Sequence, residues 1–249
     1  MKCVGFVTRL GGLIVMLSAL PGCQNITGAM PVSQVRVINA SPDAPGFDIY
    51  QGASVQSGSA LAHNLGFGTV TSYVAIAPGV STIAADTAGS RQQMTTTRGT
   101  FAAAAQYTVL IGNIAGDLSQ TVLTDQSVPA PNGQISVRFL DQAARFNAGV
   151  DVYFVPAGST VANVSPILTN VSFGANSGYV NLLAGTYTLL LLPARTIPGP
   201  ETVPLYTGAK VTYTAGSART LVLLDQREVA EPGFQVITAD DYDAPSLTN

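Results

Sequence analysis

The second half of this chain repeats the first, and this internal similarity restricts the fold more than any other feature of the sequence. The segment Phe-Asp-Ile-Tyr at 47–50 recurs as Val-Asp-Val-Tyr at 150–153, and Arg36 has a counterpart in Arg138, 102 residues later. The matched segments keep their order, and the offset grows steadily to 112 residues. A unit that occurs twice indicates two domains of the same architecture. Further matched positions are Tyr73 with Tyr179, Asp48 with Asp151, and Thr108 with Thr220.

Each copy has roughly 100 residues, which is enough to fold without a disulfide. Short runs rich in Val, Ile, Thr, Tyr and Phe alternate with turn residues, and no helical periodicity is sustained. The pattern predicts an all-β chain of two tandem antiparallel β-sandwich domains of immunoglobulin-like type. In the second copy, the expected strands are 134–140, 150–155, 177–183, 186–192, 205–213, 219–224 and 234–238.

The N-terminus has the pattern of a cleaved bacterial signal peptide. Lys2 and Arg9 precede an apolar stretch at 10–20, and small residues lead to Cys23. At 1.5 Å per residue this stretch rises about 16 Å, which is too short for a bilayer core of about 30 Å. The motif Leu-Pro-Gly-Cys at 20–23 resembles the lipobox of bacterial lipoproteins. That resemblance implies cleavage before Cys23 and lipidation of its thiol, which would anchor the chain in a membrane.

These signals divide the chain into segments with distinct expected roles. The joint between the domains contains Pro129 and Pro131, which make it semi-rigid. The tether after Cys23 spans at most about 35 Å, so we expect the first domain to stay near the membrane. The expected segments are a lipoprotein signal peptide at 1–22, a tether at 23–33, a first β-sandwich at 34–126, a linker at 127–133, a second, divergent β-sandwich at 134–240 and an acidic tail at 241–249.

Residues 35–50 carry a family resemblance. They read Val-Arg-Val-Ile-Asn-Ala-Ser-Pro-Asp-Ala-Pro-Gly-Phe-Asp-Ile-Tyr, and Leu-Gly-Phe-Gly at 65–68 and Pro-Gly at 78–79 follow. This order of motifs resembles the bacterial family named domain of unknown function 4397. In the second copy, residues 141–149 replace the Ser-Pro-Asp-Ala-Pro turn, so that half resembles a divergent copy. The resemblance implies an envelope or cell-surface protein of β-sandwich type and implies no definite activity.

Asp43, Asp48 and Tyr50 are the candidate ligand-binding residues, because they lie in and just after the Ser-Pro-Asp-Ala-Pro turn. Binding residues are found disproportionately on loops that a rigid scaffold positions. We therefore expect a ligand either at the loops that close one end of a sandwich or in the cleft between the two domains.

A structural role is the alternative for the same residues. The two prolines of the turn fix their own φ angles and extend the residues before them, which gives a stiff link between strands. Asp48 and Asp151 occupy matched positions, which favours a structural role in both copies. Each would then cap a turn or pair with Arg36 or Arg138.

Composition excludes several classes of chemistry. The chain has 11 Lys and Arg residues against 14 Asp and Glu, and only 10% of its residues are charged, so a nucleic-acid partner is not expected. If Cys23 is acylated, no free thiol remains, and His63 is the single histidine. A Cys-His or Ser-His-Asp site and the usual zinc sites are therefore not expected. The segment Gly-Phe-Gly at 66–68 lacks the third glycine of a nucleotide loop. We assign no catalytic residue, metal or cofactor.

Carboxylate chemistry is the one catalytic class that the sequence leaves open, because two acids at about 5 to 9 Å hydrolyse glycosides. No spacing marks a pair among the candidates. The densest acidic cluster, at 240–243, is either a Ca²⁺ site or a solvated acidic tail, and it lacks the glycine and distal Glu of an EF-hand. The candidate carboxylates are Asp43, Asp48, Asp141, Asp151, Asp225, Glu228 and Glu231.

The sequence therefore predicts a lipid-anchored protein of the bacterial cell envelope that acts as a non-catalytic binding or interaction module. Its expected partners are the membrane, through Cys23, and an envelope polysaccharide or a surface protein. Gln24 follows the cysteine where Asp would resemble an inner-membrane retention signal, so an outer membrane is preferred for a Gram-negative source. The alternatives are a structural spacer without a ligand and a carboxylate-based glycan hydrolase.

Overall fold

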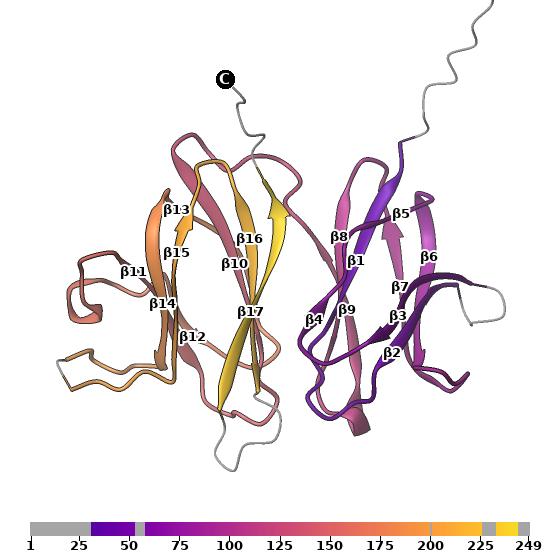
Figure 1. The fold of residues 1–249 in the computed structure, drawn as a ribbon, viewed down its shortest axis with the longest axis horizontal. Helices are drawn as coiled ribbons and strands as arrows, with labels where there is room; N and C mark the ends of the chain where they lie inside the picture. The colour runs from indigo at the N-terminus through magenta and orange to yellow at the C-terminus, as the bar shows by residue number, and fades with distance from the viewer. Residues whose placement is uncertain (1–30, 53–57, 200, 226–232, 244–249) are drawn as a thin grey trace, which may run out of the picture. The chain divides into compact units, whose positions relative to one another are not determined.

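The computed structural model describes residues 31–52, 58–199, 201–225 and 233–243. The expected signal peptide, Cys23 and most of the tether lie outside these residues, as do Glu228 and Glu231. Regular structure in the described part is β, apart from two short 3₁₀ turns at Ala115–Asp117 and Val161–Asn163 (Figure 1). No helix in that part is long and apolar enough to cross a membrane. The all-β prediction is confirmed.

The first sandwich consists of nine strands in two sheets. One sheet has the order β4-β1-β8-β9, with β5 also paired to β1, and the other has the order β3-β2-β6-β7. The strands are β1 (Ser33–Asn39), β2 (Phe47–Gln51), β3 (Ser59–Leu65), β4 (Thr69–Val70), β5 (Val74–Ile76), β6 (Gly79–Thr87), β7 (Gln93–Phe101), β8 (Gln106–Gly112) and β9 (Ser119–Thr124).

The second sandwich has the same strand order in eight strands. Its sheets run β13-β10-β16-β17 and β12-β11-β14-β15, and the long β13 stands where the first sandwich has β4 and β5. The strands are β10 (Gln134–Gln142), β11 (Val150–Pro156), β12 (Leu168–Val171), β13 (Asn176–Leu183), β14 (Gly185–Pro193), β15 (Tyr206–Tyr213), β16 (Ala218–Asp225) and β17 (Phe234–Tyr242).

One parallel pair interrupts each otherwise antiparallel sandwich. Strand β1 runs parallel to β8, and β10 runs parallel to β16. A parallel pair needs a long crossover connection, and here the crossover is the other sheet of the same sandwich. The first strand of each sandwich therefore gains its parallel partner only when a late strand of that sandwich is in place.

Each sandwich has its own apolar core between its two sheets. Phe47, Ile49 and Phe101 are fully buried in the first core. Phe139 and Leu191 are buried to the same extent in the second core. Alternation along β2 and β11 places every second residue in these cores and the residues between them on the outer faces. The sequence pattern follows the same alternation, which explains why the strands were predictable.

A third apolar cluster joins the two sandwiches, which form one compact unit. It is built from the sheets β4-β1-β8-β9 and β13-β10-β16-β17 and holds eight buried side chains. Four come from each sandwich, and they are Ile38, Ala40, Leu110, Leu123, Leu140, Val222, Leu224 and Ala239.

The C-terminal boundary differs from the prediction. Strand β17 continues through Tyr242, and Asp241 is only 4% exposed. The interpretation of 241–249 as an acidic tail is therefore wrong for its first two residues, because Asp241 pairs with a buried arginine. The structure also adds the short strand β12, which the sequence pattern did not reveal.

Candidate functional site

Asp48 caps two turns of the first sandwich. Its Oδ1 accepts a hydrogen bond from the backbone N–H of Asn64 at 2.9 Å, and its Oδ2 accepts one from Gly89 at 2.9 Å. Both donors have positive φ angles, 49° for Asn64 and 70° for Gly89, so each marks a tight turn. Burial opposes ionisation, but these two hydrogen bonds and His63 outweigh it and hold the pKa of Asp48 below its ordinary value.

Asp151 does the same in the second sandwich. It accepts hydrogen bonds from the backbone N–H of Asn170 at 2.7 Å and of Arg195 at 2.9 Å, and φ is positive at both donors. Of the two structural roles expected for Asp48 and Asp151, turn capping matches the contacts. Pairing with the arginines of the preceding strands is wrong, because both carboxylates face the outer side of their sheets.

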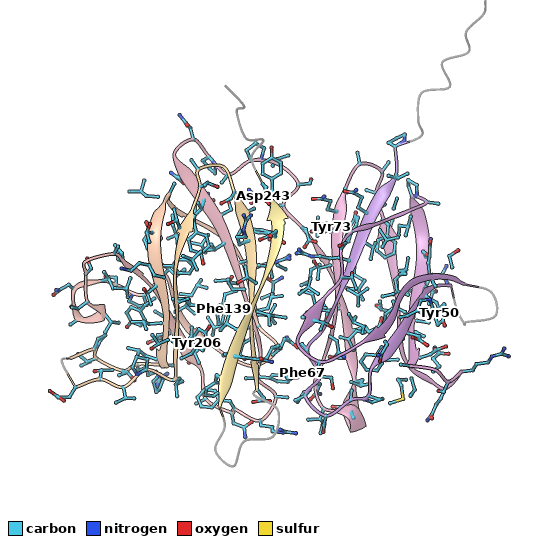
Figure 2. All side chains as sticks on the ribbon, in the orientation of Figure 1. Tyr50, Phe67, Tyr73, Phe139, Tyr206 and Asp243 are labelled. Carbon is cyan, nitrogen blue, oxygen red and sulfur yellow. The ribbon has the colours of Figure 1, made fainter. Side chains whose placement is uncertain are left out.

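Asp43 lies apart from the other two candidate ligand residues. Its Oδ1 accepts a hydrogen bond from Ala115 N at 2.8 Å, and its Oδ2 is 4.0 Å from the guanidinium of Arg145 in the second sandwich. Asp48 and Tyr50 instead share the outer face of the sheet β3-β2-β6-β7, where Figure 2 labels Tyr50. The structure thus brings two of the three residues together.

We call Asp48, Tyr50, His63, Ala84 and Asp86 the outer-face site. Asp48 lies directly opposite Asp86 on β6, and Tyr50 lies directly opposite Ala84. Directly opposed side chains on one face are close neighbours, so two carboxylates meet here. His63 Nδ1 is 3.5 Å from Asp48 Oδ1, and its ring meets the ring of Tyr50 edge to face.

The matching face of the second sandwich is apolar. Asp151 lies opposite Leu192, and Tyr153 lies opposite Leu190. Leu192 and Tyr153 belong to a hydrophobic cluster that Val161, from the 3₁₀ turn in the β11–β12 connection, helps to cover. Neither Tyr50 nor Ala84 belongs to a hydrophobic cluster of the described residues. The first sandwich therefore has Asp and Ala where the second has two leucines.

Asp86 is an energetically costly residue in this place. It is 1% exposed, and its Oδ1 has no hydrogen-bond partner among the described residues. Burial raises the pKa of Asp86, and the negative charge of Asp48 raises it further. A buried polar atom without a partner destabilises the folded state by about 1–3 kcal/mol. Nothing in the packing of the sheet requires this carboxylate, since Leu fills the matched position.

A second group of polar residues lies buried between the two sandwiches. Arg36 is 2% exposed, and its Nε donates to Thr108 Oγ1 at 2.8 Å while its Nη2 donates to Asp241 of the second sandwich. Asp125 Oδ2 is 3.6 Å from the same nitrogen, and the guanidinium lies 4.8 Å from the ring centre of Tyr73. Burial lowers the pKa of Arg36, but Asp125 and Asp241 more than offset this, so the net pKa is raised.

Arg138 repeats this arrangement in the opposite direction. Its Nε donates to Thr220 Oγ1 at 3.0 Å, and its Nη2 donates to Asp125 of the first sandwich at 2.5 Å. Its guanidinium lies 4.9 Å from the ring centre of Tyr179. Each arginine therefore crosses to the aspartate of the other sandwich. We call these eight residues the inter-sandwich network, and its members are Arg36, Tyr73, Thr108, Asp125, Arg138, Tyr179, Thr220 and Asp241.

A hollow of about 370 Å³ opens beside this network. Its lining includes Thr71, Ser72 and Tyr73 from the break between β4 and β5, and Thr238 and Asp240 from β17. The second sandwich has the unbroken strand β13 at the matched place. A cleft between the sandwiches thus exists on the side where the first sandwich interrupts its edge strand.

Asp141 and Asp225, two further candidate carboxylates, are buried. Burial raises the pKa of Asp141 to about 7, against the effect of a hydrogen bond from Ala143 N and with a contribution from Asp225. Asp225 is 2% exposed and also has a raised pKa, chiefly through burial. Neither side chain is open to a polysaccharide chain, so the pair does not have the access that a glycan hydrolase needs.

Arginines neutralise the acidic cluster at 240–243. Arg219 pairs with Asp240, 2.8 Å from its Nε, and with Asp243, while Asp241 pairs with Arg36. Among the residues that the structure describes, no group of three His, Cys, Asp or Glu side chains is placed to hold a metal ion.

The comparisons with solved structures give low overall similarity. The Bacillus anthracis TIE protein is 8% identical with a TM-score of 0.26, and 79% of this chain aligns with 34% of that chain. This chain thus spans about a third of the length of that protein. A streptococcal family 41 carbohydrate-binding module is 12% identical with a TM-score of 0.24, over 76% of this chain and 93% of the module. A family CBM26 module from Eubacterium rectale Amy13K is 12% identical with a TM-score of 0.23, over 86% of this chain and 98% of the module.

No curated protein matches this chain. A family model does match part of it, over residues 33–153, which contain the first sandwich, the connection and the beginning of the second sandwich. This range includes the Ser-Pro-Asp-Ala-Pro turn, Asp48 and Tyr50. That the rest of the second sandwich is a divergent copy stays a prediction, based on its matched strand order. Over residues 33–153 this chain is therefore similar to the family described as domain of unknown function, DUF4397.

Proposed function

We propose that this protein is a lipid-anchored, non-catalytic binding module of the bacterial cell envelope, and that the outer-face site contacts its ligand. The observation that carries the proposal is Asp86, a buried carboxylate at a position where the second sandwich has Leu192. Residues kept at a cost to stability are found preferentially at functional sites. Lipidation of Cys23 supplies the anchor in this proposal.

The chemistry of the site indicates which ligands it suits. His63 has a side chain that is 69% exposed, so its imidazole and the rim of Asp48 are what a ligand meets first. Asp48, whose side chain is 12% exposed, offers carboxylate oxygens, which accept hydrogen bonds from hydroxyl or ammonium groups. An envelope polysaccharide presents many such donors. Asp86 is only 1% exposed, so it would act on such a ligand through its charge beside Asp48 rather than by direct contact.

Binding and stability respond differently to one substitution. Asp86→Leu introduces the residue of the second sandwich, so we expect the melting temperature to rise and ligand binding to be lost. The measurement is thermal unfolding of the full chain with and without a panel of envelope glycans and peptidoglycan fragments. A ligand at a hundredfold excess over its Kd stabilises the native protein by about 2.7 kcal/mol.

Two further variants make the test decisive. His63→Ala removes an exposed side chain and should weaken binding with little change in the melting temperature without ligand. Asp117→Asn removes an exposed acid of the same sandwich outside the site, where the Asp117 side chain accepts a hydrogen bond from Asn113, and should change neither quantity. If Asp86→Leu keeps the full ligand response, the outer-face site is not the binding site.

The inter-sandwich network favours a second candidate function, a structural spacer. It fixes the two sandwiches to each other through paired buried charges, as a protein that sets a distance from the membrane would require. A spacer has no saturable ligand. A flat response across the panel, together with a fixed end-to-end distance between labels at Thr100 and Thr207, would support the spacer.

A further inference from the structure

The charged pairs between the two sandwiches are the same in both directions. Arg36 pairs with Asp241, and Arg138 pairs with Asp125. Within each sandwich a tyrosine holds the aspartate in place: Tyr73 OH donates to Asp125 Oδ2 at 2.7 Å, and the matched tyrosine of the second sandwich donates to Asp241 Oδ2 at 2.8 Å. Such reciprocity defines an isologous interface, in which one patch meets a second patch of the same kind.

The hydrogen bonds of this interface are complete only when the sandwiches are docked. Thr108 Oγ1 accepts from Arg36 and donates to Asp125, so within one sandwich the arginine and the aspartate are held in position by a shared hydroxyl. The guanidinium of Arg36 finds its closest carboxylate, and a backbone carbonyl at Asp240, only across the interface. Removing one partner of a buried pair is strongly destabilising, because it leaves an uncompensated buried charge.

Apolar residues pack beside the charged centre and come equally from both sandwiches. Ile38 and Leu110 of the first sandwich pack with Leu140 and Val222 of the second in a single cluster. Desolvated polar contacts packed beside apolar residues are found at the centre of stable protein interfaces. Beyond Asp125, which directly follows β9, the segment that connects β9 to β10 contributes no charged residue to this arrangement.

We infer that the face joining the two sandwiches is a self-complementary docking surface, whose fitting partner is another sandwich of this same kind, and that it holds the two halves together without help from the connecting segment. The inference is independent of the proposed function. It concerns the sheets β4-β1-β8-β9 and β13-β10-β16-β17, whereas the outer-face site lies on the sheet β3-β2-β6-β7. The chain is in this sense a dimer within one polypeptide. In a pair of two first sandwiches, Arg36 of each copy would meet Asp125 of the other.

The test uses the full chain with a protease site inserted after Val128, which is 60% exposed. After cleavage, the two halves should elute together at the size of the uncut protein at micromolar concentration. Halves that separate while both keep their β-sheet circular dichroism would overturn the inference. Native mass spectrometry of the cut protein after prolonged incubation should also show pairs of two first sandwiches, and their absence would refute the fit to a second copy.

Matched variants identify what holds the halves together. Arg36→Ala in the cut protein should raise the Kd between the halves by about 100-fold or more. Arg219→Ala is the control, because all partners of Arg219 lie within the second sandwich, and it should leave that Kd unchanged. Leu140→Asp places a charge in the apolar cluster between the sandwiches and leaves the inter-sandwich network intact. It should also separate the halves. If neither Arg36→Ala nor Leu140→Asp weakens the complex, the halves are held by other contacts.

Discussion

Strand β6 of the first sandwich and strand β14 of the second occupy the same place in the same topology, yet their outward residues differ in character. At two successive outward positions, β6 has Ala84 and Asp86 where β14 has Leu190 and Leu192. The second face is closed by a covering turn, and the first contains a carboxylate pair. Because the two sandwiches share one architecture, the requirements of folding do not explain why their outward residues differ. In our proposal, the first sandwich contacts the ligand and the second has a supporting role.

Substitution of the matched arginines of the inter-sandwich network should change the free energy of unfolding by similar amounts in the two halves. This is the largest effect that we expect. Arg36→Ala and Arg138→Ala should each lower the free energy of unfolding by about 3–5 kcal/mol, since each leaves a buried aspartate without its cation. Urea unfolding followed by circular dichroism measures both. Arg219→Ala should stay within about 1 kcal/mol of the parent protein. A large effect for one arginine and none for the other would break the symmetry between the halves.

Asp141 should make the stability of the second sandwich depend on pH in a way that the first sandwich does not share. The matched residue Asn39 accepts from Ser41 N at 3.0 Å and donates from its amide to Leu65 O at 3.0 Å. Asp141 accepts likewise from Ala143 N, but its Oδ2 has no partner among the described residues. The neutral amide of Asn39 carries no charge to bury, whereas burial of the Asp141 carboxylate, with a contribution from Asp225, raises its pKa to about 7.

The sign of the pH effect follows from that shift. The folded protein binds this proton more tightly than the unfolded chain, so its stabilisation is full below about pH 4 and is lost as the pH rises through 7. The loss is on the order of 4 kcal/mol. Asp141→Asn should remove this pH-dependent loss of stability and stabilise the protein at pH 8. Asn39→Asp should introduce a loss of the same kind. Urea titrations at pH 5 and pH 8 compare the two exchanges, and equal stability of the parent at both values would refute the shift.

Substitution of either capping carboxylate, Asp48 or Asp151, should lower the stability by a similar amount. Asp48→Asn and Asp151→Asn each weaken two hydrogen bonds from backbone donors at positive φ, and each should cost about 1–2 kcal/mol. For Asp48, whose pKa is lowered, the contribution is present at neutral pH and is lost as the pH falls through the folded pKa. Thermal unfolding at pH 7 and pH 3 measures this. If Asp48→Asn leaves stability unchanged and abolishes binding, the structural role of Asp48 is refuted.

The smallest effect that we expect is an increase in stability. Asp86→Leu removes a buried unpartnered oxygen and adds apolar surface, which should stabilise the first sandwich by about 1 kcal/mol. The reciprocal exchange Leu192→Asp should destabilise the second sandwich by more than that. Differential scanning calorimetry of both variants tests this. A loss of stability in Asp86→Leu would mean that the carboxylate has a structural partner and would remove the basis for the outer-face site.

Much of the fold could be predicted because local patterns determine it. The seven strands expected in the second half all exist, since alternation and turn residues mark each one within a few positions. Strand β12 was missed because it has four residues, and two of them are exposed. A strand so short carries no alternation long enough to recognise.

The pairing of charges could not be predicted in the same way. Asp48 is close to Arg36 in sequence but lies on the opposite sheet of the sandwich, so proximity along the chain suggested a wrong partner. The true partner, Asp241, is 205 residues from Arg36. A usable signal was nevertheless present, because Arg36, Tyr73 and Thr108 all recur at matched positions in the second half. Polar residues kept together in both copies of a repeat indicate a shared contact.

The separation of Arg36 and Asp241 has a consequence for biosynthesis. Strand β1 is made first among the described strands and β17 last, so Arg36 lacks its closest carboxylate until every other described strand has been synthesised. A product that ends before β17 would retain a complete first core, but its Arg36 would lack Asp241. Such a product should be prone to aggregation and open to proteolysis. The last described strand therefore completes the charge pairing of the first.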